Sequence, residues 1–218
     1  MHNDGSDSSV LSRLRRKKDR AGDRALLYEV LDSCLIGVVS TVLNGEPWSV
    51  PMLIGRDGNR VLLHGSTGAG ALSHISSGAP VALSATIIDG ITVSERQFTH
   101  SANYRSVALR GKCSIVPREN MRRALDIFTD SIIPGRSAEC PEHSVKEVSQ
   151  TILLQLLITE DNWIAKMRSG PPSGGENGWT GVIPIQTSYG FPTQRSGDDI
   201  PESVLRMIEN RARPEDPF

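Results

Sequence analysis

Residues 101–113, SANYRSVALRGKC, decide the fold of this chain. Val107, Leu109 and Cys113 alternate with polar or small residues, and this period of two predicts a strand with one buried face. Before them, residues 103–106 place an amide, a phenol, a guanidinium and a hydroxyl side by side. Such a group suits a planar, anionic ligand, because a guanidinium binds phosphate or carbonyl oxygens through paired N–H groups. An ordinary polar strand end is the alternative interpretation.

The composition is that of one globular domain with extensions. The chain has 218 residues, of which 38% are hydrophobic and 22% charged, so a sizeable core is expected. A net charge of −1 gives no general attraction to nucleic acid. We expect no association with a membrane, because no apolar run approaches the roughly 20 residues that span a bilayer.

The cysteines and the N-terminus indicate a cytoplasmic protein. Cys34, Cys113 and Cys140 are odd in number and lack C-x-x-C spacing, which argues against both a disulfide framework and a zinc site. We therefore expect no metal. The N-terminus is polar and has no apolar segment behind its basic cluster, so a secretory signal is not expected.

Three parts are expected along the chain. Residues 1–23 are predicted to form a flexible basic arm, residues 24–193 the folded domain, and residues 194–218 a C-terminal tail. The seven basic residues between positions 13 and 24 form either a patch for an anion or a solvated arm. Leu27, Val30 and Leu31 have the spacing of a short amphipathic helix over residues 24–33.

Strands are predicted to dominate the domain. Asn44-Gly45 predicts a two-residue hairpin, and Asp57-Gly58 a second turn. Helices are predicted at 71–77 and 118–131. About eight strands are expected, at 35–43, 48–55, 60–64, 80–88, 91–94, 104–116, 151–159 and 179–185, and residues 163–167 are a candidate for a further one. Strands and helices do not alternate regularly, so the prediction is a mainly β fold, a closed or split barrel with inserted helices.

A glycine-rich segment, HGSTGAG at residues 64–70, follows a predicted strand. Glycine lets the backbone approach a ligand, so the segment is either part of a binding site or a flexible connection. It has the spacing of neither a P-loop nor a dinucleotide-binding fingerprint. His64 is either a structural residue or a side chain against a cofactor ring. No G-x-S-x-G motif is present to support a Ser-His-Asp triad.

Several motifs together resemble the flavin-nucleotide-binding branch of the pyridoxamine 5′-phosphate oxidase-like superfamily, which includes the nitroimidazole-resistance proteins. They occur in one order over about residues 13–193: RAGDR, LD at 31–32, GEPWSVP at 45–51, LHGS at 63–66, the segment 101–107, IPGR at 133–136, KMRSGP at 166–171 and WTGVIP at 179–184. The resemblance implies an FMN-binding split β-barrel that forms a homodimer, with FMN in two clefts between the subunits.

The resemblance also implies which residues lie near the flavin. Pro51, His64, Gly65 and Ser66 would surround it, with His64 the one candidate for a catalytic role. The other residues implied to approach the cofactor are Tyr104, Arg105, Ser106, Lys166 and Trp179. Lys166 and Trp179 resemble residues that the family brings to the site from a partner subunit.

One position departs from the family. Relatives commonly carry Arg or Lys about six residues after the histidine, and this chain has Gly70 there. An uncompensated phosphate would lose a contact of about 1.5–3 kcal/mol. The leading hypothesis is an FMN-dependent oxidoreductase that acts on an unknown small molecule, with NADH or NADPH as a candidate donor. The alternatives are a non-catalytic flavin-binding protein, or a relative that has lost FMN and binds another small anion.

Overall fold

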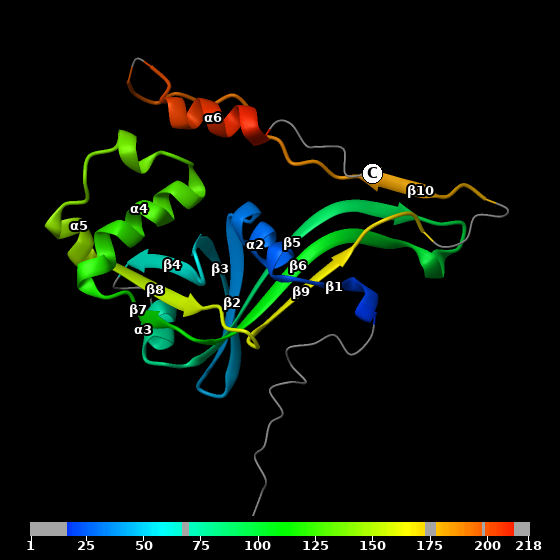
Figure 1. Ribbon diagram of the computed structural model, residues 1–218, viewed down its shortest axis with the longest axis horizontal. Helices are drawn as coiled ribbons and strands as arrows, with labels where there is room; N and C mark the ends of the chain where they lie inside the picture. The colour runs from blue at the N-terminus through cyan, green and yellow to red at the C-terminus, as the bar shows by residue number, and fades with distance from the viewer. Residues whose placement is uncertain (1–16, 67–69, 173–177, 198, 212–218) are drawn as a thin grey trace, which may run out of the picture.

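The structure is a computed structural model that describes residues 17–66, 70–172, 178–197 and 199–211. Within these residues the fold is a ten-stranded, wholly antiparallel sheet with helices attached (Figure 1). The elements in chain order are η1 (Lys18–Arg20), β1 (Ala21–Gly22), α2 (Arg24–Ser33), β2 (Ile36–Leu43), β3 (Glu46–Asp57), β4 (Arg60–Ser66), α3 (Gly70–Ser76), β5 (Pro80–Val93), η2 (Gln97–Thr99), β6 (Ser101–Lys112), β7 (Ser114–Ile115), η3 (Arg118–Asn120), α4 (Met121–Ile132), η4 (Ser137–Glu139), α5 (Val145–Gln150), β8 (Thr151–Leu157), β9 (Trp163–Arg168), β10 (Gly181–Pro184) and α6 (Glu202–Arg211).

The sheet curls into a split barrel. The strand order is β1-β9-β6-β5-β2-β3-β4-β8-β7, with β10 added beside β5. Strands β6 and β7 lie six places apart in this order, yet only Cys113 separates them in the chain. A flat sheet would place them roughly 29 Å apart at about 4.8 Å per strand, which one residue cannot span. The sheet must therefore curve until its two ends approach, which confirms the predicted fold class.

Alternating side chains explain the burial of the long strands. In β5, Val81, Leu83 and Ala85 are buried while the residues between them are exposed. Helix α2 lies against the inner face, and its four buried apolar residues, Leu26, Leu27, Val30 and Leu31, join the barrel core. Asp23 caps this helix by accepting a hydrogen bond from the Leu26 N–H at 3.0 Å.

A second, smaller core lies under α4. The buried residues of this helix include the three predicted from the sequence, Met121, Leu125 and Phe128. They pack with Leu62 of β4 and Leu153 of β8. Helix α4, together with Val148 of α5, thus covers the part of the sheet around Leu62 and Leu153 on the side away from the barrel core.

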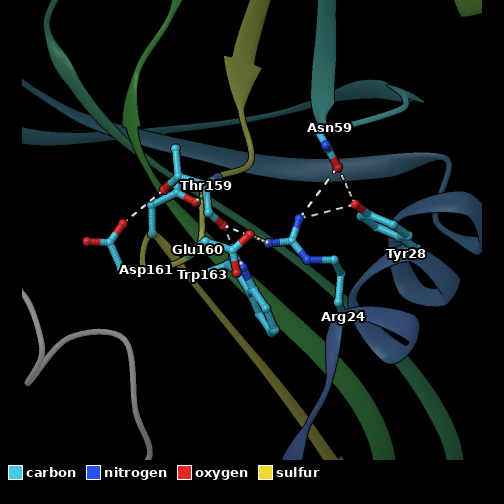
Figure 2. Close-up of polar contacts among 8 residues, drawn as sticks. Arg24, Tyr28, Asn59, Thr159, Glu160, Asp161 and Trp163 are labelled. Carbon is cyan, nitrogen blue, oxygen red and sulfur yellow. Dashed lines mark hydrogen bonds and ion pairs between the residues drawn. The ribbon is translucent and has the colours of Figure 1, made fainter.

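A polar network holds the start of α2 against two loops of the barrel (Figure 2). Arg24 forms an ion pair of 2.7 Å with Glu160 and stacks 5.8 Å from the Trp163 ring centroid. The Trp163 indole N–H donates to the Thr159 carbonyl at 2.9 Å. Tyr28 donates to the Asn59 side chain in the β3–β4 turn, so three distant segments are fixed together. This cluster is structural, because its groups satisfy one another.

The C-terminal part returns to the domain. Strand β10 pairs with β5, and the Ile185 N–H donates to the Asp89 carbonyl at 3.0 Å. Helix α6 is anchored to η4 through Glu139, which accepts hydrogen bonds from the backbone N–H and hydroxyl of Ser203. The sequence prediction of a plain tail over residues 194–218 missed this helix, because its first turn is anchored by a residue 64 positions away.

Other local predictions need correction. The predicted break at Asp89-Gly90 is a bulge within one continuous strand, β5, rather than a boundary between two strands. The second hairpin turn is Gly58-Asn59, with Asp57 already paired to Arg60. Asn44-Gly45 is confirmed, with φ of 53° and 84° as a tight hairpin requires. In the predicted arm, residues 1–16 lie outside the described residues, but Ala21 and Gly22 pair with β9.

Candidate functional site

Strand register places most of the predicted site residues on one face of the sheet. Residues directly opposite each other in an antiparallel pair point to the same face. Pro51 lies opposite Val38, and Val38 opposite Ser84. Ser84 lies opposite Ala108 on β6. These four residues therefore share the face that points away from the barrel core, which we call the outer face.

The β6–β9 side of the outer face carries three predicted residues. Ser106 lies opposite Thr86 on one side and Lys166 on the other. Tyr104, two residues before Ser106, shares this face by alternation. The hydroxyl of Thr86, which sequence analysis did not single out, thus lies beside this group. The signal that could have revealed it is the alternation in the sequence of β5, where Ser84 and Thr86 flank Ala85.

His64 and Ser66 reach the outer face from β4. Leu62 lies opposite Gly55 of β3, and His64 follows Leu62 by two residues. The His64 ring lies 5.2 Å from the Phe128 ring of α4. Although His64 is exposed, its contact with this helix removes water from the imidazole. Loss of hydration, together with repulsion from His143, lowers the pKa of His64 and favours the neutral ring at pH 7.

Gly65 and Arg105 lie on the opposite, inner face. A Cβ on Gly65 would come within 2.2 Å of Cδ1 of Leu72, so the absence of a side chain here lets α3 pack closely. The glycine therefore has a packing role in this chain.

Arg105 is held by two carboxylates. Its Nη2 lies 2.6 Å from Asp89, its Nε donates to the same carboxylate, and its Nη1 contacts Glu29 of α2. The hydrogen bonds that the guanidinium donates to Asp89 raise the pKa of Arg105, against the opposing effect of burial. The interpretation of Arg105 as a flavin ligand thus finds no support in its contacts, which tie α2 to the bulge of β5.

Lys166 differs from Arg105 in its surroundings. Its ammonium lies 5.3 Å from the centroid of the Tyr104 ring. Within the part of the chain that the structure describes, no carboxylate forms an ion pair with it. Lys166 therefore supplies positive charge to the outer face.

Trp179 lies apart from this group within one chain. It precedes β10, whose first residue, Gly181, lies opposite Val93. Val93 is seven residues along β5 from Thr86, a separation of about 23 Å at 3.3 Å per residue. The indole is 68% exposed. One chain therefore does not bring Trp179 to Lys166.

The outer face also carries exposed aliphatic side chains. They lie on strands β2, β3, β5 and β10 and are Ile36, Val38, Leu53, Ile88, Ile91 and Ile183. Hydroxyls and a cation are thus set beside an apolar surface. This combination fits a flavin nucleotide, which has a flat, largely apolar ring with polar edges and a phosphate.

Neither a metal cluster nor a membrane-spanning helix is found in the described residues. They contain no group of three or more His, Cys, Asp or Glu side chains arranged to hold a metal ion. They also contain no helix long and apolar enough to cross a bilayer.

Comparison with known proteins identifies the family. Residues 23–163 match the family model described as pyridoxamine 5′-phosphate oxidase, and the chain belongs to this family. No curated protein sequence matches the chain.

Solved structures share the fold of this chain. The FAD and heme binding protein from Mycobacterium smegmatis is 36% identical, with a TM-score of 0.84 over 87% of this chain and 97% of that one. The flavocytochrome Anf3 from Azotobacter vinelandii is 27% identical, with a TM-score of 0.82 over 91% and 97% of the two chains. A candidate 5-nitroimidazole antibiotic resistance protein from Bacteroides thetaiotaomicron, 19% identical, shares the fold, with a TM-score of 0.57 over 68% and 86%.

Proposed function

We propose that this protein binds a flavin nucleotide on its outer face and uses it as an oxidoreductase of small molecules. The observation that carries the proposal is the shared face of Pro51, His64, Tyr104, Ser106 and Lys166, which lie on four different strands. Similarity to the flavin-binding protein from M. smegmatis supports it independently.

The chain's own residues would bind and orient the cofactor. A bound flavin supplies hydride or electron transfer. The ammonium of Lys166 favours negative charge on the ring edge or the phosphate, and the hydroxyls of Ser106 and Thr86 can donate hydrogen bonds to it. His64, neutral at pH 7, can form one wall and donate through its ring N–H. NADH or NADPH is the candidate electron donor.

The sequence indicated FMN, whereas the M. smegmatis neighbour is described as binding FAD. Both nucleotides share the isoalloxazine ring, the ribityl chain and one phosphate, to which the proposed contacts belong. At 36% identity, this similarity favours FAD for this chain.

The test is the visible spectrum of the purified protein, followed by chromatography of the ligand released on denaturation. Absorption near 370 and 450 nm, typical of oxidised flavins, is expected, and the retention time separates FMN from FAD. A protein that neither contains flavin nor takes it up at micromolar concentrations would contradict the proposal. Turnover with NADH or NADPH then distinguishes an oxidoreductase from a flavin-binding protein without activity.

We also propose a homodimer whose subunits meet at the outer face. The six exposed aliphatic side chains of this face would be buried there, which favours association through a symmetric contact. Trp179 is distant from Lys166 of its own chain. In a dimer, Trp179 of one subunit could approach a flavin bound beside Lys166 of the other. Light scattering should give twice the monomer mass, and a monomer at micromolar concentration would contradict the shared site.

Heme binding is a second candidate. The neighbours at 36% and 27% identity are described as a FAD and heme binding protein and a flavocytochrome, respectively. Their similarity covers 87% and 91% of this chain. His64 is the residue that fits, because a lowered pKa leaves its imidazole neutral and able to bind iron. Reconstitution with hemin should give a Soret band that His64→Ala shifts and that His100→Ala does not.

A further inference from the structure

On the outer face the ammonium of Lys166 lies close to the aromatic ring of Tyr104. The distance from Nζ to the ring centroid is 5.3 Å, within the range of a cation–π contact. Ser106 lies directly opposite Lys166, so Tyr104 is its diagonal neighbour on the adjacent strand. Long and aromatic side chains interact across such a diagonal.

Arg105, next to Tyr104 on β6, is neutralised in a way that Lys166 is not. Arg105 points to the inner face, where Asp89 and Glu29 neutralise it. No such ion pair is found for Lys166 in the described part of the chain. A lysine side chain has four rotatable bonds, so without a bound anion its ammonium can point in many directions. The ring of Tyr104 restricts these directions without neutralising the charge.

We propose that Tyr104 is a positioning residue whose ring holds the Lys166 ammonium on the outer face, ready for the anionic part of the ligand. This inference rests on the proposed flavin site. It assigns the essential role to the aromatic face of Tyr104, whereas the family resemblance implied only that Tyr104 approaches the cofactor. An ion pair in place of the ring would fix the lysine equally well but would cancel its attraction for the ligand.

The contact can be measured without any ligand. Reductive methylation with ¹³C-formaldehyde labels lysines and keeps their charge. The Lys166 methyl resonance, assigned with Lys166→Arg, should be shifted upfield by the ring current of Tyr104. Tyr104→Phe should keep this shift and Tyr104→Leu should abolish it. A Lys166 resonance at the position of exposed lysines in the unmutated protein would overturn the inference.

Flavin titration then tests the consequence. A cation–π contact at an exposed site, worth about 0.5–1 kcal/mol, corresponds to a two- to fivefold change in dissociation constant. We expect Tyr104→Leu to weaken flavin binding by this factor and Tyr104→Phe to leave it unchanged. Lys166→Met should weaken binding tenfold or more. The matched control is Lys112→Met, at the far end of β6, which should bind as the unmutated protein does.

The double variant protects the test against a merely structural effect. When Lys166 is already Met, Tyr104→Leu should cause no further loss of flavin affinity. An equal loss in both backgrounds, or Tyr104→Phe as weak as Tyr104→Leu, would overturn the positioning role. If the unmutated protein binds no flavin, the proposed function fails, while the resonance shift of Lys166 still decides whether the ring holds the lysine.

Discussion

Arg105→Met should destabilise the protein without greatly affecting flavin binding. The substitution keeps most of the aliphatic stem and removes the guanidinium from Asp89 and Glu29. The side chains of Arg105 and Asp89 are only 25% and 17% exposed. The variant would therefore leave a largely desolvated carboxylate without its cation.

The size of the effect follows from the burial. Exposed ion pairs contribute up to about 1 kcal/mol, whereas breaking a fully buried one costs about 3–5 kcal/mol. For this partly buried pair we expect the free energy of unfolding to fall by about 2 kcal/mol. Arg122→Met is the control, because its ion pair with Glu142 is 3.7 Å long and its two side chains are 50% and 97% exposed. Its expected loss is below about 0.5 kcal/mol.

Urea unfolding of the flavin-free protein, at one protein concentration, measures both variants. With a slope of about 2–3 kcal/mol per molar urea, the midpoint of Arg105→Met should fall by about 0.7–1 M. Adding Asp89→Asn should recover part of the loss, because the unpaired charge is removed. Unchanged stability of the flavin-free protein, together with a tenfold weaker flavin affinity, would refute this reasoning and restore Arg105 as a ligand.

Three further outcomes are expected. Gly70 starts α3 with no atom within 4 Å of an added Cβ and without a positive φ, so Gly70→Arg should tighten flavin binding about fivefold, and by less at high salt. Unchanged affinity would place the phosphate elsewhere. Exposed Cys140 should react with Ellman's reagent in the native protein, whereas Cys113, whose pKa burial raises to about 11, should react only after unfolding. Hydrogen bonds from Ser203 lower the pKa of Glu139, so the anchoring of α6 should be complete above pH 4.5 and weaken as the pH falls further. The amide proton shift of Ser203 should follow this titration, and Glu139→Gln should abolish the pH dependence of that shift.

Local patterns in the sequence were sufficient for most of the fold. The period of two in β5 and β6, the helical spacing in α2 and α4, and the Asn44-Gly45 turn each act through neighbours in the chain. The motifs common to the family then supplied the split barrel, which the strand order confirms. The bulge of β5 and helix α6 were missed, because their causes are contacts with distant segments.

For the candidate site, too, local patterns predicted only part of what the structure shows. The sequence by itself identified a polar segment at residues 103–106, but it could not say which side of the sheet each residue faces, beyond alternation. Only the tertiary structure decided that Arg105 lies beside Asp89 and Glu29, while Lys166 lies free of carboxylates beside Tyr104 within the described residues. The physical reason is that charge at a site depends on which groups strand pairing and helix packing bring within a few ångströms. Arg105 lies 16 positions from Asp89 and 76 from Glu29, and no local pattern in the sequence indicates such pairs.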